Sequence, residues 1–474
     1  MHKPWHTLLF TIALFLVMGA LGLVFPEEGI KLGGKLALSF PSTPALFKNP
    51  EEKADITALL EAVNKVDTTF RIDEPGEAVD TSAQVLEPPN LRMDIQHPER
   101  NALANFYDAL RVLKNKEEQI RVLHYGDSQI EGDRITDYLR LKLQGQFGGS
   151  GPGLLSLTPL TARASTKIYK NEEWLRYTTF TAKDKTVPHN SYGVRAAFSR
   201  FAPYTADADS AALLSASIQL VSAAGAGYNK VRLYYGGARK RTWCEFFDGP
   251  ALVSADSLEA GGNFHWQDFE VGRGSNSHQF NFSGFDSPDF YALSLESEKG
   301  VMVDNIAMRG SSGTFFHRLD RDQMTRFYKQ LNVKLIILQF GGNALPSLED
   351  STMAGNYARY ISRQIGIVKK LAPAASILFI GPSDMSVKRG TDYVTYELLE
   401  PLRDYLREAV LSSGCAYFDL YDVMGGRNSM PAWVEEKLAG KDYTHFSPKG
   451  ARKVATLLYA AIIKDYNNYT RTLK

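Results

Sequence analysis

Residues 120–133 read IRVLHYGDSQIEGD and join an apolar run to a break at Gly126-Asp127-Ser128. The run over 120–125 is typical of a buried parallel strand. Apolar residues then recur every three or four positions over 135–143, which predicts a helix. Open α/β sheets bind their ligands at the carboxyl edge of the strands. We therefore expect the Ser128 hydroxyl at that edge, beside a helix N-terminus whose N–H groups favour negative charge.

This stretch alone leaves two roles open for Ser128, because serine and aspartate are also common helix caps. Three segments downstream favour a reactive serine over a cap. They read NIAMRG at 305–310, LIILQFGGN at 335–343 and DYTHFSPKG at 442–450. The first two end predicted strands at glycines, and the third lies just before the last predicted helix.

In this order, Gly-Asp-Ser, Gly, Gly-x-Asn and Asp-x-x-His resemble the SGNH (GDSL-like) hydrolase family. The resemblance implies a flavodoxin-like, three-layer α/β/α domain with a Ser-His-Asp site. Ser128 would be the nucleophile, His445 the base that removes its proton, and Asp442 the group that orients the imidazole. The oxyanion hole would consist of the backbone N–H groups of Ser128 and Gly310 and the side-chain amide of Asn343.

Four residues near these motifs are not assigned to the chemistry. Gln129 and Ala344 depart from the family pattern, which often has leucine and aspartate at these positions. That aspartate usually supports the loop, so its replacement by Ala344 bears on the orientation of Asn343. We expect His124 and Asp127 to be structural rather than catalytic.

From residue 301 onward, strand and helix patterns alternate and predict a parallel sheet covered on both faces. The predicted strands are 301–308, 333–340, 376–380 and 416–420, and the predicted helices are 314–331, 355–371, 393–412 and 447–466. An amphipathic helix predicted over 99–116 precedes the first strand. The catalytic domain is therefore expected to comprise residues 99–164 and 304–474.

Between 165 and 303, the helical periodicity gives way to short strand patterns separated by Gly, Asn, Asp and Ser turns. The predicted strands are 193–201, 214–221, 230–235, 243–247, 264–271, 278–282 and 290–296. A single βαβ step needs only about 30 residues. We therefore interpret 165–303 as a β-sandwich inserted between the first two strands of the catalytic domain. Such an insert resembles the carbohydrate-binding-like modules of some cell-wall-directed SGNH proteins.

The position of the insert suggests that it binds substrate. It begins and ends near the loops that carry Ser128 and Gly310, so we expect it to present glycan at the same edge of the sheet. Replacing it with a short linker should then leave the cleavage of small esters nearly unchanged. Its aromatic rings either pack in the core or stack on sugars, and the sequence assigns neither role to any one of Tyr234, Tyr235, Trp243, Phe246, Phe247 and Trp266. The glycine-rich loop at 148–153 is better explained as a helix-terminating turn than as a substrate-edge loop.

The apolar stretch from Leu8 to Phe25 follows Lys3 and is either a secretory signal or an uncleaved membrane anchor. The lack of an Ala-x-Ala-like cleavage site favours the anchor. The lone basic residue before the stretch favours a cytoplasmic N-terminus, so the rest of the chain would be exported to the periplasm. Residues 1–26 would then tether the protein to the inner membrane. Residues 27–98 would form a stalk or linker, with one helix over 51–66 and a proline-rich part over 71–98.

The composition excludes several classes of protein. The 474 residues carry a formal net charge of +1, so bulk charge gives no reason to expect a nucleic-acid partner. The two cysteines, Cys244 and Cys415, fall in different predicted domains, and a disulfide is not expected. No Cys/His cluster has metal-ligand spacing, and no cofactor is expected.

Three functions are compatible with these observations. The first is a serine esterase that removes O-acetyl groups from a cell-envelope polysaccharide such as peptidoglycan. The second is an O-acetyltransferase that uses the same site to acetylate a glycan and is supplied by a membrane acyltransferase partner. The third is a non-catalytic glycan-binding protein, against which the intact Ser128, Asp442 and His445 argue. The sequence does not decide whether water or a sugar hydroxyl accepts the acyl group.

Overall fold

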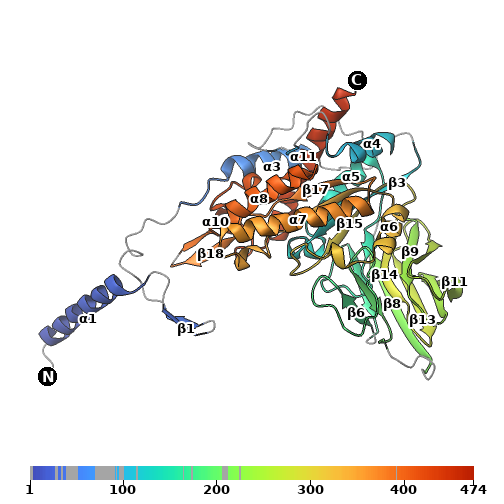
Figure 1. Cartoon of the computed structure of the whole chain (residues 1–474), viewed down its shortest axis with the longest axis horizontal. Helices are drawn as coiled ribbons and strands as arrows, with labels where there is room; N and C mark the ends of the chain where they lie inside the picture. The colour runs from blue at the N-terminus through green and yellow to red at the C-terminus, as the bar shows by residue number, and fades with distance from the viewer. Residues whose placement is uncertain are drawn as a thin grey trace.

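The computed structural model describes residues 4–26, 30–33, 36–38, 52–69, 91, 93–95, 101–113, 116–163, 165–171, 174–204, 212–223, 226–390 and 392–473. Figure 1 shows a mixed α/β body with a β-sandwich at one end and the helix α1 (Pro4–Val24) standing apart from it.

A five-stranded sheet lies at the centre of the catalytic domain, in the order β15-β3-β16-β17-β20. Its strands are β3 (Gln119–Gly126), β15 (Gly300–Ala307), β16 (Val333–Gln339), β17 (Ser376–Ile380) and β20 (Ala416–Phe418). Every neighbouring pair is parallel. Numbered along the chain, the order is 2-1-3-4-5, which is the flavodoxin-like order. The predicted fold class is confirmed.

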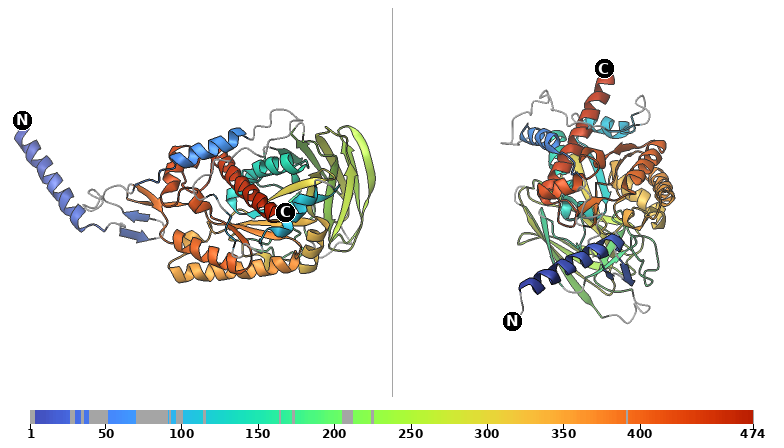
Figure 2. Two further views of the ribbon diagram at one scale, coloured as in Figure 1. Left: turned by 90° about the horizontal axis from the view of Figure 1, so that it is seen from above. Right: turned by 90° about the vertical axis from the view of Figure 1, so that its left-hand side faces the viewer.

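Helices cover both faces of this sheet (Figure 2). One face packs on α4 (Ala104–Leu113), α5 (Thr136–Phe147) and α11 (Pro448–Thr472), and the other on α6 (Arg321–Gln330), α7 (Ser351–Leu371) and α8 (Leu399–Ser412). Successive strand residues alternate between the two cores, as Val122 and Leu123 do. Because both faces are buried, the strands read as continuous apolar runs, which explains why the sequence predicted them.

Several predicted helix boundaries were wrong. The helix predicted from 393 begins only at Leu399, because 392–395 instead forms β19 (Asp392–Thr395), paired with β18 (Ser386–Arg389). Tyr393, Val394 and Thr395 all favour extended backbone. The helix predicted from 314 is a short turn, η3 (Phe316–Arg318), followed by α6, whose first turn is capped by the Asp320 side chain. Two short helices, α9 (Leu420–Val423) and α10 (Ser429–Glu435), were not predicted.

The inserted region forms two antiparallel sheets, β11-β10-β13-β8-β5 and β12-β9-β14-β7-β6, with β4 also paired to β14. Their strands are β4 (Gly153–Leu155), β5 (Thr166–Lys170), β6 (Leu175–Thr178), β7 (Ala197–Arg200), β8 (Leu214–Ser222), β9 (Lys230–Gly236), β10 (Thr242–Asp248), β11 (Ala251–Leu258), β12 (His265–Glu270), β13 (Ser277–Gly284) and β14 (Asp289–Glu296). The insert thus begins before 165, since β4 belongs to it, and ends before 300, where β15 begins. Strand β11 was not predicted because nearly all of it is exposed, which removes the apolar alternation.

The sandwich and the catalytic domain share one hydrophobic core. Phe327 of α6 packs against Tyr234, Phe264 and Tyr291 of the sandwich, with ring centroids 5.4, 4.4 and 5.7 Å away. The buried Arg121 of β3 binds Asp304 of β15 at 3.0 Å and also contacts Ser294 and Glu296 of β14. The insert is therefore built into the domain rather than attached through a linker.

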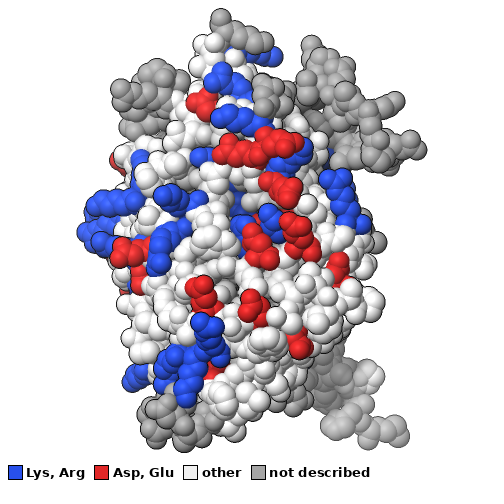
Figure 3. All heavy atoms as spheres, turned by 90° about the vertical axis from the view of Figure 1, so that its right-hand side faces the viewer, with Lys and Arg blue, Asp and Glu red and all other residues white. Residues whose placement is uncertain are grey.

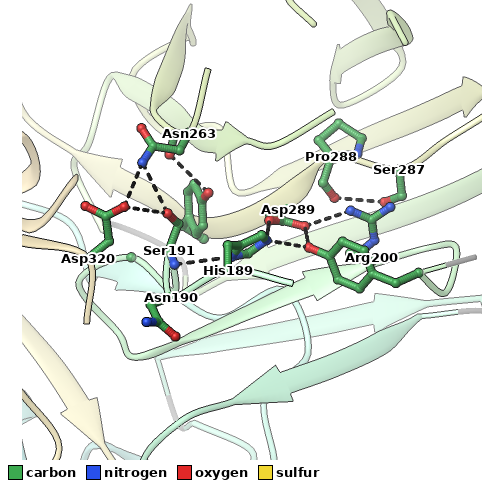
Figure 4. Close-up of polar contacts among 12 residues, drawn as sticks. His189, Asn190, Ser191, Arg200, Asn263, Ser287, Pro288, Asp289 and Asp320 are labelled. Carbon is green, nitrogen blue, oxygen red and sulfur yellow. Dashed lines mark hydrogen bonds and ion pairs between the residues drawn. The ribbon is translucent and has the colours of Figure 1, made fainter. Parts of the chain in front are cut away.

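A polar network reinforces this junction (Figure 4). Asp320, which caps α6, accepts hydrogen bonds from Ser191 Oγ at 3.0 Å and from Asn263 Nδ2 at 3.1 Å. Deeper in the sandwich, the buried Asp289 binds Arg200 at 2.8 Å and His189 at 2.9 Å. The buried charges of Asp289 and Arg200 thus pair with each other, as burial of an ion requires.

The aromatic residues of the insert are mostly core. Tyr234, Tyr235 and Phe246 are buried and Phe247 is half-buried, whereas Trp243 and Trp266 are 45% and 44% exposed. Only these two tryptophans among the six remain candidates for stacking on a sugar. Cys244 and Cys415 are both buried and free.

The N-terminal helix α1 has a mean hydropathy of 2.5 and, by length and composition, is able to cross a membrane. After it, β1 (Ile30–Gly33) and β2 (Leu36–Leu38) form a hairpin.

The predicted stalk at 27–98 needs correction. Helix α3 (Thr57–Thr69) and the residues before it bury Ile56, Leu59 and Val63 in the catalytic core, where Leu91 and Met93 also pack. Asp94 pairs with Tyr417 of the edge strand β20. The apolar face seen in the sequence thus belongs to the catalytic domain, and most of the proline-rich part at 71–98 lies outside the described residues.

Candidate active site

The structure brings Ser128, His445 and Asp442 together at the carboxyl edge of the parallel sheet. Ser128 follows Asp127, which is the first residue after β3. Its Oγ lies 2.8 Å from His445 Nε2. On the other side of the imidazole ring, Nδ1 lies 2.8 Å from Asp442 Oδ2. A proton on Nδ1 makes Nε2 the acceptor for the serine proton, which is the arrangement needed for an activated hydroxyl.

Asp442 is held in its role by its own loop. Its Oδ1 accepts the backbone N–H groups of Thr444 and His445, both at 3.1 Å. Partial burial opposes ionisation, but these hydrogen bonds and the His445 ring together lower the pKa of Asp442 below its ordinary value. The carboxylate is therefore charged at neutral pH and able to stabilise an imidazolium.

Gln129 fixes the histidine loop against the serine turn, a role that the sequence did not reveal. Its Nε2 donates to the Thr444 carbonyl at 2.6 Å, and its Oε1 accepts the Phe446 N–H at 3.4 Å. Arg134 adds a bond to the Phe446 carbonyl at 3.0 Å and another to the Ser128 carbonyl. Gln129 thus binds the backbone on both sides of His445, and Arg134 binds it on one side. The only signal in the sequence was that Gln129 stands where leucine is common.

Asp127 and Asn343 form a second pair beside the serine. Asn343 Nδ2 donates to Asp127 Oδ2 at 2.9 Å and to the Ser311 carbonyl at 3.2 Å, while Asp127 Oδ1 accepts the Gln129 N–H at 2.9 Å. Burial raises the pKa of Asp127 to about 6. Asp127 therefore takes over the support of Asn343 that Ala344 cannot give. The Asn343 amide lines the cavity, and its N–H groups already donate to Asp127 and Ser311. It can bind an oxyanion only by sharing one of these N–H groups. The hydrogen bond to Ser311 is the longer and therefore the weaker of the two.

Two cavities meet at this point. A small one, of about 240 Å³, is lined by Ser128, His445 and Asn343 together with Pro382 and Tyr396. A larger groove of about 1,070 Å³ is lined by the same three residues, by Gly310 and by a rim of charged side chains: Glu131, Arg134, Asp137, Arg309 and Arg452. Gly310 has φ +75°, a conformation that glycine adopts without strain. All the predicted oxyanion residues therefore border the groove.

The helix predicted over 135–143 is present as α5, but it does not follow Ser128 directly. Residues 128–133, η2 (Ser128–Asp133), form 3₁₀ turns broken by a kink at Glu131 and Gly132, and α5 begins only at Thr136. Gly132 and Asp133, with φ of 68° and 70°, interrupt the helical path. The N–H groups at Ser128 therefore belong to a turn capped by Asp127, and a long helix dipole does not act on the serine.

Two further expectations concern the surroundings of the site. His124 is buried between Gln339 and Thr136, at 3.0 and 3.1 Å, and burial lowers its pKa to about 4, so it is a neutral, structural residue. The loop at 148–153 ends α5 at Gly148, which has φ 79°, and leads into β4, as expected of a helix-terminating turn.

The chain is similar to a structure described as "Peptidoglycan O-acetylesterase in action, 5 min", with a TM-score of 0.61 and 20% sequence identity over 79% of this chain and 99% of that chain. At this identity the likeness concerns the fold. The chain shares the fold of that structure. No protein-family model and no curated protein sequence matches it.

Two other solved structures align less well. A family two carbohydrate esterase from Clostridium thermocellum, in complex with cellohexaose, is 12% identical over 63% of this chain and 98% of that chain, with a TM-score of 0.24. The salicylyl-acyltransferase SsfX3 is 12% identical over 66% of this chain and 97% of that chain, with a TM-score of 0.29.

Asp127→Asn tests the support of Asn343. The carboxylate accepts one hydrogen bond on each oxygen, whereas an asparagine has one acceptor and would turn its NH₂ toward either Asn343 or the Gln129 N–H. We expect kcat for a small acetyl ester to fall about 100-fold, as it does when an oxyanion donor is lost, with KM little changed. The same variant removes a group whose pKa rises on folding. Protonation of Asp127 stabilises the fold as the pH falls through about 6. That contribution to the pH dependence of thermal unfolding should disappear in the variant. Wild-type kcat in Asp127→Asn would show that Asn343 is held without Asp127.

Proposed function

We propose that the protein is an exported serine esterase that removes O-acetyl groups from a cell-envelope polysaccharide such as peptidoglycan. The observation that carries this proposal is the continuous relay from Ser128 through His445 to Asp442, open to a groove lined by Gly310 and Asn343. A protein that only binds glycan has no need for an ordered relay, so the non-catalytic alternative is disfavoured.

In the proposed reaction, Ser128 Oγ attacks the ester carbonyl while His445 Nε2 takes its proton. Asp442 stabilises the imidazolium, and the donors at Ser128, Gly310 and Asn343 bind the oxyanion. His445 then returns the proton to the sugar oxygen, which leaves as an alcohol. Water attacks the acyl-serine with His445 as base and releases acetate. In the acetyltransferase alternative, a sugar hydroxyl replaces water in this last step and a membrane partner supplies the acetyl group.

The sandwich provides independent support for a glycan substrate. The outward face of β10, β13 and β8 bears a hollow of about 310 Å³ lined by Trp243, Glu245, Asn281 and Ser217. An exposed indole beside amide, hydroxyl and carboxylate groups can stack on a sugar ring and bind its hydroxyls. The solved structure with the similar fold is described as a peptidoglycan O-acetylesterase. The apolar α1 is consistent with tethering the enzyme at the inner membrane, facing the periplasm.

The test uses the full-length protein in a non-ionic detergent with O-acetylated peptidoglycan as substrate. We expect acetate to be released in an amount equal to the ester lost, by the wild type and not by His445→Ala. Adding a deacetylated oligosaccharide as acceptor separates the two reactions, because a transferase would acetylate it at the expense of free acetate. Intact glycan esters after incubation with active enzyme, measured against a small ester, would rule out the proposed substrate.

A further inference from the structure

A third cavity, of about 380 Å³, lies where the sandwich meets the catalytic sheet. Asn305 and Ala307 of β15 line it on one side, and Thr166 to Tyr169 of β5 on the other. It shares Glu131, Gly132, Thr161, Ala162 and Arg309 with the catalytic groove, so the two cavities adjoin. The ion pair between Glu131 and Arg309, at 2.6 Å, stands at their boundary.

Besides Arg309, which is paired with Glu131, three arginines line this junction cavity: Arg163, Arg176 and Arg195. Arg163 and Arg195 donate to the Asn305 carbonyl at 3.1 and 3.0 Å, and both reach the Leu154 carbonyl at 3.4 Å. The Nε of Arg176 is buried and has no hydrogen-bond partner among the described residues. Within that part of the chain, none of the three forms an ion pair within 4.0 Å.

The nearby carboxylates are already neutralised by other arginines. Glu131 is paired with Arg309 at 2.6 Å and Asp133 with Arg140 at 2.8 Å. Asp304, the third, is held by Arg121 at the domain junction. The three cavity arginines are therefore positive charges without a directly paired carboxylate among the described residues, in a partly enclosed space.

These guanidinium groups without direct ion pairs cost free energy in the absence of a ligand. Burial lowers the pKa of all three guanidinium groups, and for Arg195 burial together with the charges of Arg163 and Arg176 lowers it to about 9. A buried charge without a counterion is unfavourable. A bound anion would relieve both the desolvation and the mutual repulsion of the three side chains.

We propose that the junction cavity is a subsite for a carboxylate carried by the glycan whose acetyl ester lies at Ser128. Planar guanidinium groups bind carboxylates through paired hydrogen bonds. Tyr169, which is 52% exposed at the cavity, offers a ring on which the adjoining sugar can stack. The substrate class is thus an acidic O-acetylated glycan, with the carboxylate on a uronate or on an attached peptide. This inference rests on the proposed function for the role of Ser128.

The outer surface gives no alternative site of capture on the face drawn in Figure 3. Lysines and arginines there are interspersed with aspartates and glutamates. The overall net charge is only +1. Selection for an acidic glycan would therefore come from local contacts in the cavity rather than from long-range attraction.

Binding is tested first, without catalysis. Calorimetric titration of the full-length protein in detergent would use tetragalacturonate, a muropeptide with free carboxylates, and neutral cellotetraose. We expect at least one acidic ligand to bind more tightly than cellotetraose, and Arg176→Gln to raise its Kd about tenfold, as loss of a charge-assisted hydrogen bond predicts. Arg176→Lys keeps the charge without the fork and should give an intermediate Kd. Arg273→Gln, which removes an exposed arginine of the same module, should match the wild type.

The two acidic ligands distinguish a uronate from a peptide carboxylate. Equal Kd values for acidic and neutral ligands, or an unchanged Kd in both Arg176 variants, would overturn the subsite. Turnover of acetylated forms of the same ligands separates this result from the proposed function. If acidic ligands bind through Arg176 but are never deacetylated, the subsite is supported and the proposed esterase activity is contradicted. If acidic and neutral ligands are deacetylated equally well, the esterase activity is supported and the subsite is contradicted.

Discussion

Ser128→Ala is expected to lower the hydrolysis of a small acetyl ester by about 10⁴- to 10⁶-fold, the range seen when the nucleophile of a serine relay is removed. In the proposed reaction, the Oγ, 2.8 Å from His445 Nε2, forms the acyl intermediate, and alanine leaves nothing to replace it. The fold should be unaffected, because the Ser128 side chain makes its hydrogen bond only to His445 among the described residues. The remaining activity would come from binding and from the oxyanion donors.

A serine-directed phosphonate provides the second measurement. It should label the wild type at one site and fail to label Ser128→Ala. Ser383→Ala is the matched control, since Ser383 lines the same small cavity, is 5% exposed and lies outside the relay. Equal labelling of Ser128→Ala and wild type would remove Ser128 from the mechanism.

The Ser128-His445-Asp442 relay and the parallel sheet could both be predicted from the sequence, for the same physical reason. Strands buried on both faces read as continuous apolar runs, and the chain leaves each of them at the carboxyl edge. Ser128, Gly310 and Asn343 each follow such a run, so their convergence follows from the order of the strands. Asp442 and His445 are three residues apart and meet through local loop geometry.

Contacts made between distant segments were not accessible in this way. Gln129 binds Thr444 and Phe446 across more than 300 positions, and no local pattern encodes that pairing. The junction cavity likewise forms only where β5 and β15 meet. The expectation of a detachable insert was drawn from strand patterns alone, which do not show which aromatic rings face the neighbouring domain.

Replacing residues 151–296 with a short Gly-Ser linker is therefore expected to abolish cooperative folding and activity on every substrate. Joining the ends is not the difficulty, because the Ser297 N–H already donates to the Ser150 carbonyl at 3.1 Å. The loss comes from the shared core. Without the sandwich, Phe327 loses its three ring partners, and the buried Arg121 loses Ser294 and Glu296.

The magnitudes decide this outcome. Each large apolar side chain that becomes exposed costs about 1.5–3 kcal/mol, and Arg121 keeps only Asp304 of its partners. Several such losses exceed the roughly 5–15 kcal/mol by which domains are usually stable.

Thermal unfolding followed by circular dichroism and by small-ester activity measures the effect. Phe327→Ala is the graded test, expected to cost about 3–5 kcal/mol, and Trp243→Ala, on the outward face of the sandwich, should leave thermal stability nearly unchanged. A deletion protein that unfolds cooperatively and cleaves small esters at the wild-type rate would show that the catalytic core is complete without the sandwich. The insert would then act only in presenting the glycan.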